Sequence, residues 1–147
     1  MRLITVCMLC VLLTACGGPS GGPEEALRQW IAQSEAAAED LDRRGLLSMV
    51  SENYADARGN DRQALGKILR LYFLRQKSVA LVVKIDELTI VDETAAEILI
   101  TAAGVGTTTR ALGVNADAYQ FSLELEKDDD EWFLIGARWG ELGQELH

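Results

Sequence analysis

The stretch Ser-Val-Ala-Leu-Val-Val-Lys-Ile-Asp-Glu-Leu-Thr-Ile-Val at residues 78–91 decides the fold, because the hydrophobic pattern of the chain changes there. β-Branched residues replace the three- and four-residue apolar spacing of the preceding segment. Residues 94–105 alternate in polarity after a turn at Asp92-Glu93, and residues 119–125 and 132–139 continue as extended segments. Four consecutive strands predict an antiparallel sheet.

Before residue 78 the apolar spacing is helical. Residues 23–44 begin with Pro-Glu-Glu, which suits the positive end of a helix, and Gly45 would end this helix. A short helix around residues 46–50 follows, and Asn60 or Asp61 caps a third helix. Helices followed by strands predict a single α+β domain, with N-terminal helices packed on a curved antiparallel sheet.

The N-terminus has the layout of an export signal. Arg2 precedes an apolar run from Leu3 to Leu13, which is shorter than the about 20 residues that a membrane-spanning helix needs. The run ends in Leu13-Thr14-Ala15-Cys16, which resembles the lipobox of bacterial lipoproteins. The resemblance implies cleavage between Ala15 and Cys16 and acylation of Cys16, for example with palmitate. The alternative is an ordinary secretory signal in which Cys16 has no role.

Further expectations follow from the lipobox. Gly17 stands where Asp commonly signals inner-membrane retention, so the resemblance implies an outer membrane lipoprotein facing the periplasm in a Gram-negative cell. The predicted division is a signal peptide (1–15), an acylated cysteine with a flexible tether (16–22), a folded domain (23–142) and a tail (143–147). Membrane contact would come from the acyl chains on Cys16.

Composition excludes several classes of protein. The formal net charge is −9, from 23 acidic and 14 basic residues, which argues against nucleic-acid partners and against direct adhesion to anionic lipid headgroups. Cys7 and Cys10 lie in the segment expected to be removed, so neither an intrachain disulfide nor a cysteine metal site is expected in the mature protein.

The order of elements resembles the nuclear transport factor 2-like superfamily, which includes ketosteroid isomerase and the polyketide cyclases. The resemblance rests on residues 54–62, entering the third helix, and on residues 132–139 in the last strand, and it covers Pro23 to Leu142. It implies a cone-shaped fold with a pocket at its open end. Isomerases, dehydratases, transport adaptors and assembly domains share this cone, so function must be argued from the site.

A catalytic site of the isomerase or dehydratase type needs a base in an apolar pocket and donors aimed at an oxyanion. Tyr54, Tyr72 and Tyr119 are candidate donors, and Asp56 or Asp117 is the candidate acid. Each candidate also has a structural interpretation. Tyr72 fits the apolar stripe of a helix and Tyr119 the apolar face of a strand, both as core residues, and Asp56 fits a turn. No residue-by-residue alignment joins them to the family's catalytic positions, so the sequence favours a non-catalytic domain.

Other chemistries find little support. His147 is the only histidine and is expected in a frayed tail, so the His–Asp pair of the family's dehydratases is not available. The acidic run at residues 128–131 lacks the spacing of a calcium loop and predicts a hairpin turn. We therefore expect neither a metal nor a cofactor.

The last strand supplies candidate contact residues. Simple alternation puts Trp132, Leu134 and Arg138 on the face opposite the core. Arg138 would lie outward, paired on the surface, or at the pocket mouth. An exposed Trp132 beside Leu134 would suit a homodimer interface.

Together these features predict a lipid-anchored envelope protein whose domain binds a small apolar molecule or an envelope protein without catalysis. Two alternatives remain: an isomerase, dehydratase or cyclase that uses an Asp/Tyr pair, and a structural dimerisation or assembly domain.

Overall fold

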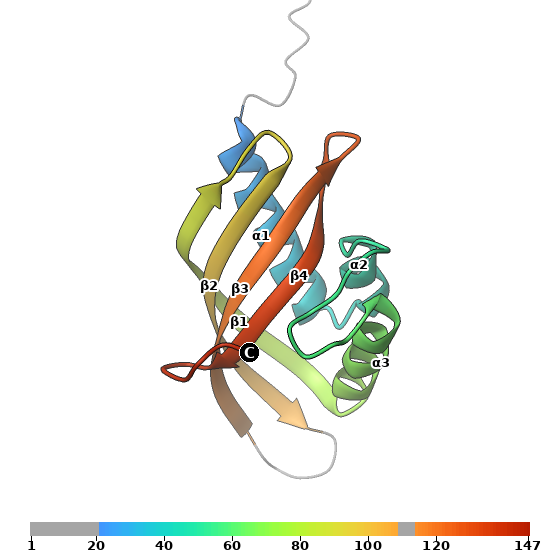
Figure 1. Ribbon diagram of the computed structural model, residues 1–147. Coiled ribbons are helices and arrows are strands. Elements are labelled where there is room, and N and C mark those ends of the chain that lie inside the picture. The colour runs from blue at the N-terminus through green and yellow to red at the C-terminus, as the bar shows by residue number, and fades with distance from the viewer. Residues whose placement is uncertain (1–20, 109–113) are drawn as a thin grey trace, which may run out of the picture.

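The computed structural model describes residues 21–108 and 114–147 (Figure 1). The predicted signal peptide, the Leu13–Cys16 motif and most of the tether lie outside the described residues. Among the residues that are described, no helix has the length and apolar character needed to cross a membrane.

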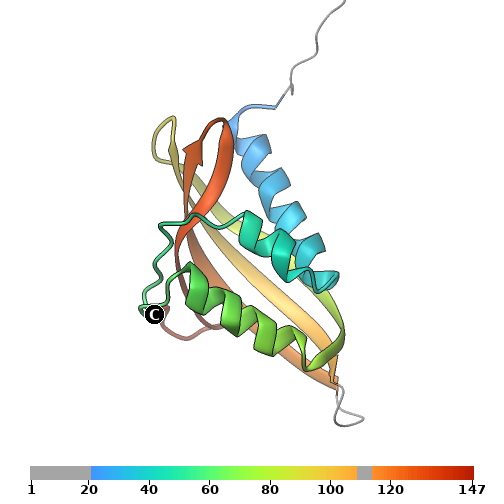
Figure 2. The same cartoon turned by 90° about the vertical axis from the view of Figure 1, so that its right-hand side faces the viewer.

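The predicted order of elements is confirmed. The helices are α1 (Pro23–Glu39), α2 (Arg43–Ser48) and α3 (Arg62–Phe73), and the strands are β1 (Gln76–Ile90), β2 (Ala95–Thr108), β3 (Val114–Asp128) and β4 (Glu131–Glu141). The strands form an antiparallel meander in the order β1-β2-β3-β4. All three helices lie on one face of the curved sheet, here called the inner face (Figure 2). The predicted α+β class with helices packed on a curved antiparallel sheet is therefore correct.

The core forms between α1 and the inner face. Leu27, Trp30 and Ile31 of α1 are buried, as their three- and four-residue spacing predicts. They meet alternate residues of the strands. These buried sheet residues are Ala96, Ile98, Ile100, Leu123, Leu125, Trp132, Leu134 and Ala137.

The first helix ends earlier than the sequence predicts. It stops at Glu39 because Leu41 adopts a left-handed backbone conformation with φ of 55°. The Asp42 side chain then accepts a hydrogen bond of 2.9 Å from the Gly45 backbone N–H and caps α2. Gly45 therefore lies inside the second helix instead of ending the first.

Residues 49–57, here called the edge segment, run along the free edge of β4. Backbone hydrogen bonds join the Ser51 N–H to the Leu134 carbonyl at 2.9 Å and the Ala55 N–H to the Ile135 carbonyl at 3.0 Å. The Ala57 N–H donates likewise to Ala137 at 3.1 Å. The edge segment thus covers the backbone groups that an edge strand would otherwise expose.

The predicted exposure of the last strand is wrong. Trp132 and Leu134 are 6% and 9% exposed and belong to the core. In the pairing of β3 with β4, Leu125 faces Leu134 and Glu124 faces Gly136, so Ile135 is an extra, bulged residue. A bulge reverses the alternation of faces beyond it. Trp132 therefore lies on the opposite face from Arg138, and neither Trp132 nor Leu134 offers an exposed interface.

Three further segments can be compared with the expectation: the β2 and β3 strand ends, the acidic turn and the C-terminal tail. Strands β2 and β3 are longer than the segments predicted at residues 94–105 and 119–125, since β2 ends at Thr108 and β3 begins at Val114; residues 109–113 lie outside the described residues. The acidic run does form a hairpin turn, in which Asp129 and Asp130 have positive φ. His147 is not frayed, because its backbone N–H and carbonyl pair with Trp139 at 3.3 and 3.1 Å.

Replacing Leu27 by Ala tests where the core lies. Leu27 is fully buried, so we expect Leu27→Ala to lower the free energy of unfolding by about 3 kcal/mol. Leu71→Ala is the matched control, because Leu71 on α3 is 57% exposed and should cost about 0.5 kcal/mol or less. Chemical denaturation measures both. Equal losses would contradict this packing.

Candidate functional site

The edge segment holds a buried polar cluster around Asp56. The Asp56 carboxylate accepts hydrogen bonds from the Tyr54 hydroxyl at 3.3 Å and from the Arg58 and Asn60 backbone N–H groups at 3.0 and 2.8 Å. The Asn60 side-chain amide adds a bond of 2.9 Å. All these donors lie within four residues of Asp56, so the carboxylate closes the turn before α3. Its acceptor capacity is used within the turn.

Tyr54 shares this structural role. Its side chain is buried, and burial together with the charge and the hydrogen bond of Asp56 raises the pKa of the Tyr54 hydroxyl above its usual value. The protonated Tyr54 hydroxyl donates its hydrogen bond to Asp56. Two of the candidate residues, Tyr54 and Asp56, therefore do lie together, but both side chains are buried and contact each other instead of an open pocket.

The other candidates meet at the end of the inner face where β2 ends and β3 begins, here called the open end. Asp117 and Tyr119 precede the buried Leu123 by six and four residues in a regularly paired part of β3, so they share its face. Tyr72 reaches them from α3. Its pKa is raised by partial burial, then by the negative charge of Asp117, then by Tyr119.

This open-end cluster, Tyr72, Asp117 and Tyr119, is accessible. Tyr72 is 50% exposed, so the expectation that it is a core residue is wrong. Each tyrosine of the cluster has one aromatic neighbour: the ring centroids of Tyr72 and Phe73 are 6.0 Å apart, and those of Tyr119 and Phe121 are 6.3 Å apart. Two hydroxyls and a carboxylate thus lie on an apolar surface that a small molecule can reach.

A cation–π contact that the sequence did not suggest borders the inner face. The Arg58 guanidinium lies 4.3 Å from the centre of the Trp139 ring, and its Nη2 donates to the Trp139 carbonyl at 3.1 Å. The two residues are 81 positions apart, Arg58 in the turn before α3 and Trp139 in β4. No local pattern could have found this pair.

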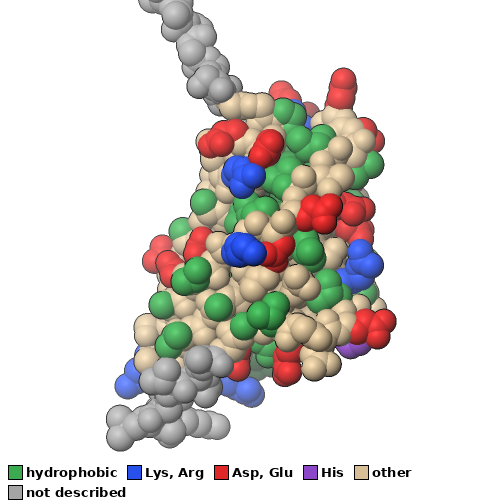
Figure 3. Space-filling model, turned by 90° about the vertical axis from the view of Figure 1, so that its left-hand side faces the viewer, with side chains coloured by type: hydrophobic (Ala, Val, Ile, Leu, Met, Phe, Trp, Pro, Cys, Tyr) green, Lys and Arg blue, Asp and Glu red, His purple; other side chains and the backbone are tan. Residues whose placement is uncertain are grey.

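Arg138 is not part of the inner face. Its side chain donates to the Ser122 hydroxyl at 3.3 Å on the outer face of the sheet. On the same face, at the other edge of the sheet, Lys84 of β1 pairs with Asp86 at 2.8 Å. Figure 3 shows the molecule from the side opposite to Figure 2, where charged side chains lie among hydrophobic ones. Of the two positions considered for Arg138, the outward one is correct.

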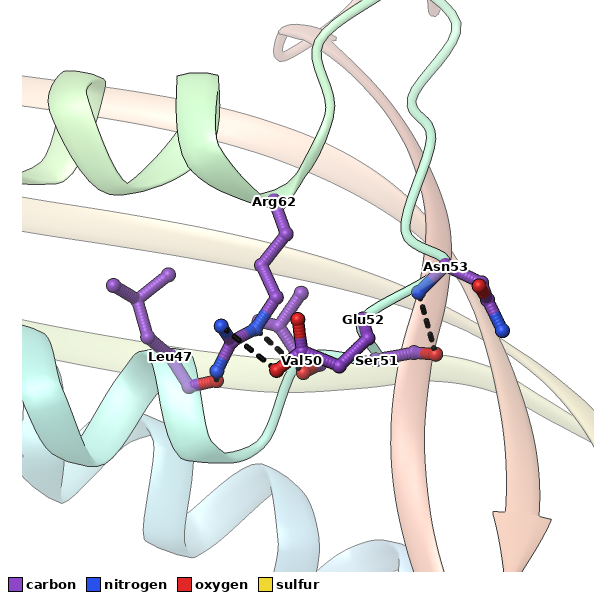
Figure 4. Close-up of polar contacts among 6 residues, drawn as sticks. All are labelled: Leu47, Val50, Ser51, Glu52, Asn53 and Arg62. Atoms are coloured by element: carbon purple, nitrogen blue, oxygen red, sulfur yellow. Dashed lines mark hydrogen bonds and ion pairs between the residues drawn. The ribbon is translucent and has the colours of Figure 1, made fainter.

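Two cavities lie between the helices and their neighbours. One of about 350 Å³ separates α1 from the β3–β4 hairpin, and Trp30 and Trp132 line it. The other, of about 520 Å³, lies between α2 and α3. At its wall, Arg62 joins the two helices: Nε donates to the Val50 carbonyl at 3.1 Å and Nη2 to the Leu47 carbonyl at 2.8 Å (Figure 4).

Comparison with known proteins identifies the fold. No protein-family model and no curated protein sequence matches this chain. Solved structures do match. A candidate scytalone dehydratase from Novosphingobium aromaticivorans superposes with a TM-score of 0.72 at 13% identity, over 84% of this chain and 89% of that chain. A candidate dehydratase of the NTF2-like family from Streptomyces avermitilis has a TM-score of 0.69 at 9% identity, over 80% and 95%.

The chain has the nuclear transport factor 2-like fold. A ketosteroid isomerase-like protein from Erwinia carotovora atroseptica superposes as well, with a TM-score of 0.68 at 13% identity over 82% of this chain and 96% of that chain. The resemblance seen in the sequence is therefore confirmed for the fold. These identities establish architecture alone, so the chemistry must come from this chain's own residues.

Replacing Asp56 by Ala tests its role in the turn. Asp56→Ala would leave buried donors without an acceptor, so we expect a loss of unfolding free energy of about 2–3 kcal/mol. Asp92→Ala is the matched control, since Asp92 accepts from the Thr94 N–H in the exposed β1–β2 turn, and its effect should be clearly smaller. Denaturant titration compares the two, and similar losses would contradict the structural role of Asp56.

Proposed function

We propose that this protein is a lipid-anchored envelope protein that catalyses proton transfer on a small apolar carbonyl compound, as an isomerase or a lyase. The observation that carries this proposal is the open-end cluster on an accessible apolar surface. The Tyr72 hydroxyl is protonated at neutral pH, as any tyrosine with a pKa of 10.0 or higher is, so it can donate a hydrogen bond to a carbonyl oxygen. Asp117 supplies the carboxylate base.

The proposed step balances without a metal or cofactor. The Asp117 carboxylate removes a proton from the carbon next to the carbonyl, and the electron pair moves onto the carbonyl oxygen. The Tyr72 hydroxyl, helped by Tyr119, stabilises the resulting oxyanion by hydrogen bonding. The proton then returns to another carbon, which is isomerisation, or a leaving group departs from the β-carbon, which is elimination.

Two considerations move the proposal from non-catalytic binding to catalysis. First, Asp117 lies close enough to Tyr72 for its charge to raise the pKa of the Tyr72 hydroxyl, although 45 positions separate the two residues in the chain. In addition, the structural neighbours include proteins named as candidate dehydratases and as isomerase-like. Non-catalytic binding at the same surface is the alternative that the following experiment separates.

Hydrogen exchange tests the catalytic proposal. The full-length protein, in non-ionic detergent, is incubated in D₂O with a panel of small cyclic and aromatic ketones, and NMR follows the loss of carbon-bound hydrogen. We expect accelerated exchange with at least one ketone, lowered about 100-fold or more by Asp117→Asn and by Tyr72→Phe. Tyr54→Phe is the matched control and should keep the rate. Ketones that bind without exchanging would favour the non-catalytic alternative.

The anchor is the second part of the proposal. It rests on the order of Arg2, the apolar run and Leu13-Thr14-Ala15-Cys16, which has the layout of a lipoprotein signal. Acyl chains on Cys16 would hold the domain at the membrane, since each buried methylene contributes about 0.8 kcal/mol. Gly17 at the next position favours the outer membrane, with the domain in the periplasm.

Metabolic labelling with an alkyne analogue of palmitate tests the anchor. We expect the wild-type protein to incorporate label and to fractionate with outer membranes, and Cys16→Ser to lose both. Cys10→Ser is the control, because Cys10 lies in the segment expected to be removed. Label that persists in Cys16→Ser would contradict lipidation at this residue.

A further inference from the structure

Positive charge is concentrated on one part of this acidic protein. Residues 62–85 contain six basic residues and no Asp or Glu, although the whole chain has a formal net charge of −9. These residues include α3, which forms one wall of the 520 Å³ cavity. The charged residues that line this cavity are Arg43, Glu52, Asp61, Arg62, Lys67 and Arg70. The net negative charge of the whole chain therefore does not hold for this cavity.

The two acidic lining residues are already engaged. Glu52 pairs with Arg62 at 3.1 Å, and that guanidinium also holds the two backbone carbonyls at the end of α2 (Figure 4). The Asp61 carboxylate accepts from the Ala64 N–H at 2.7 Å and caps α3. Glu52 is therefore paired with Arg62, whereas Asp61 keeps its charge as the helix cap, and four cations against two carboxylates leave the lining with a formal net charge of +2.

Three lining cations remain without a carboxylate partner. Within residues 21–108 and 114–147, no ion pair shorter than 4.0 Å involves Arg43, Lys67 or Arg70. Lys67 and Arg70 are three positions apart on α3, so they lie on the same side of the helix. Arg43 approaches from α2. Like charges that line one cavity repel each other, so an anion between them would be stabilised.

Close helix packing brings these cations together. Gly66 is the one buried residue of α3, and a Cβ there would lie 3.1 Å from Leu47 Cδ1 and 3.7 Å from Arg43 Nη1. The absence of a side chain at Gly66 lets α2 approach α3, and it sets the Arg43 guanidinium beside the turn that carries Lys67. The cavity is therefore formed by packing of the two helices and not by chance orientation of surface side chains.

We propose that the cavity between α2 and α3 binds a phosphate-bearing anion through Arg43, Lys67 and Arg70. Two guanidinium groups and an ammonium group match phosphate oxygens, because guanidinium binds them with two parallel hydrogen bonds and ammonium binds as a point charge. The cavity volume exceeds that of one phosphate group, so pyrophosphate is a suitable probe. The site is separate from the open-end cluster and goes beyond the proposed activity.

The natural source of the phosphate is either a soluble phosphorylated molecule or the headgroup of an anionic phospholipid. Full-length protein in non-ionic detergent is titrated with pyrophosphate at constant ionic strength, and calorimetry gives the affinity and stoichiometry. A second titration adds short-chain phosphatidylglycerol or phosphatidylcholine to the micelles. Binding of pyrophosphate alone indicates a soluble ligand, and binding of phosphatidylglycerol alone indicates a headgroup; each result supports an anion site.

Neighbouring arginines on α2 provide the decisive comparison. We expect one saturable site in the wild type and an affinity about tenfold or more weaker in Arg43→Gln and in Arg70→Gln. Arg44→Gln removes the same charge one residue away, outside the cavity lining, and should leave the affinity unchanged. Unfolding midpoints without ligand verify that the variants are folded. No saturable binding, or equal weakening by Arg44→Gln and Arg43→Gln, would overturn the proposal.

Discussion

The pairing of the edge segment with β4 is the constraint on which the rest of the structure depends. It covers the free edge of the sheet through bonds such as that from Ser51 to Leu134, and it fixes where the chain leaves the sheet to begin α3. Asp56 closes the turn that follows, and Arg62 reaches back to the end of α2. Both candidate sites use α3, so both depend on this pairing.

The path of α3 explains why the two sites have different chemistry. The helix packs only part of its surface, and its residues Ile68, Leu71 and Tyr72 are exposed, as is Leu74, which caps its C-terminus. Tyr72 lies with the aromatic residues at the open end, whereas Lys67 and Arg70 line the cavity against α2. One short amphipathic helix thus presents an apolar hydroxyl-bearing surface to one site and cations to the other. This division gives a physical reason for a helix whose apolar stripe is incompletely buried.

Local patterns in the sequence predicted the elements well, because helix and strand periods are local properties. Leu27, Trp30 and Ile31 were recognisable as a buried stripe, and residues 78–91 as a strand. The face of Trp132 was not recognisable, because a single bulged residue, Ile135, reverses alternation and leaves no compositional trace. Tyr72 and Asp117 could be named as candidates, but their meeting depends on tertiary packing. The cationic cavity was not predicted, because the net charge sums over all residues and does not show where the basic ones gather.

The most direct measurement of the central claim is the pKa of Tyr72, followed by ¹³C NMR titration of the labelled tyrosine ring. The chain has three tyrosines, so assignment by substitution is straightforward. If Tyr72 and Asp117 form one cluster, the pKa of Tyr72 lies above its usual value of 10.0 and falls towards it in Asp117→Asn. The pKa of Tyr54 should stay raised in both proteins. A Tyr72 that titrates at the usual value, unaffected by Asp117→Asn, would contradict the open-end cluster and the function built on it.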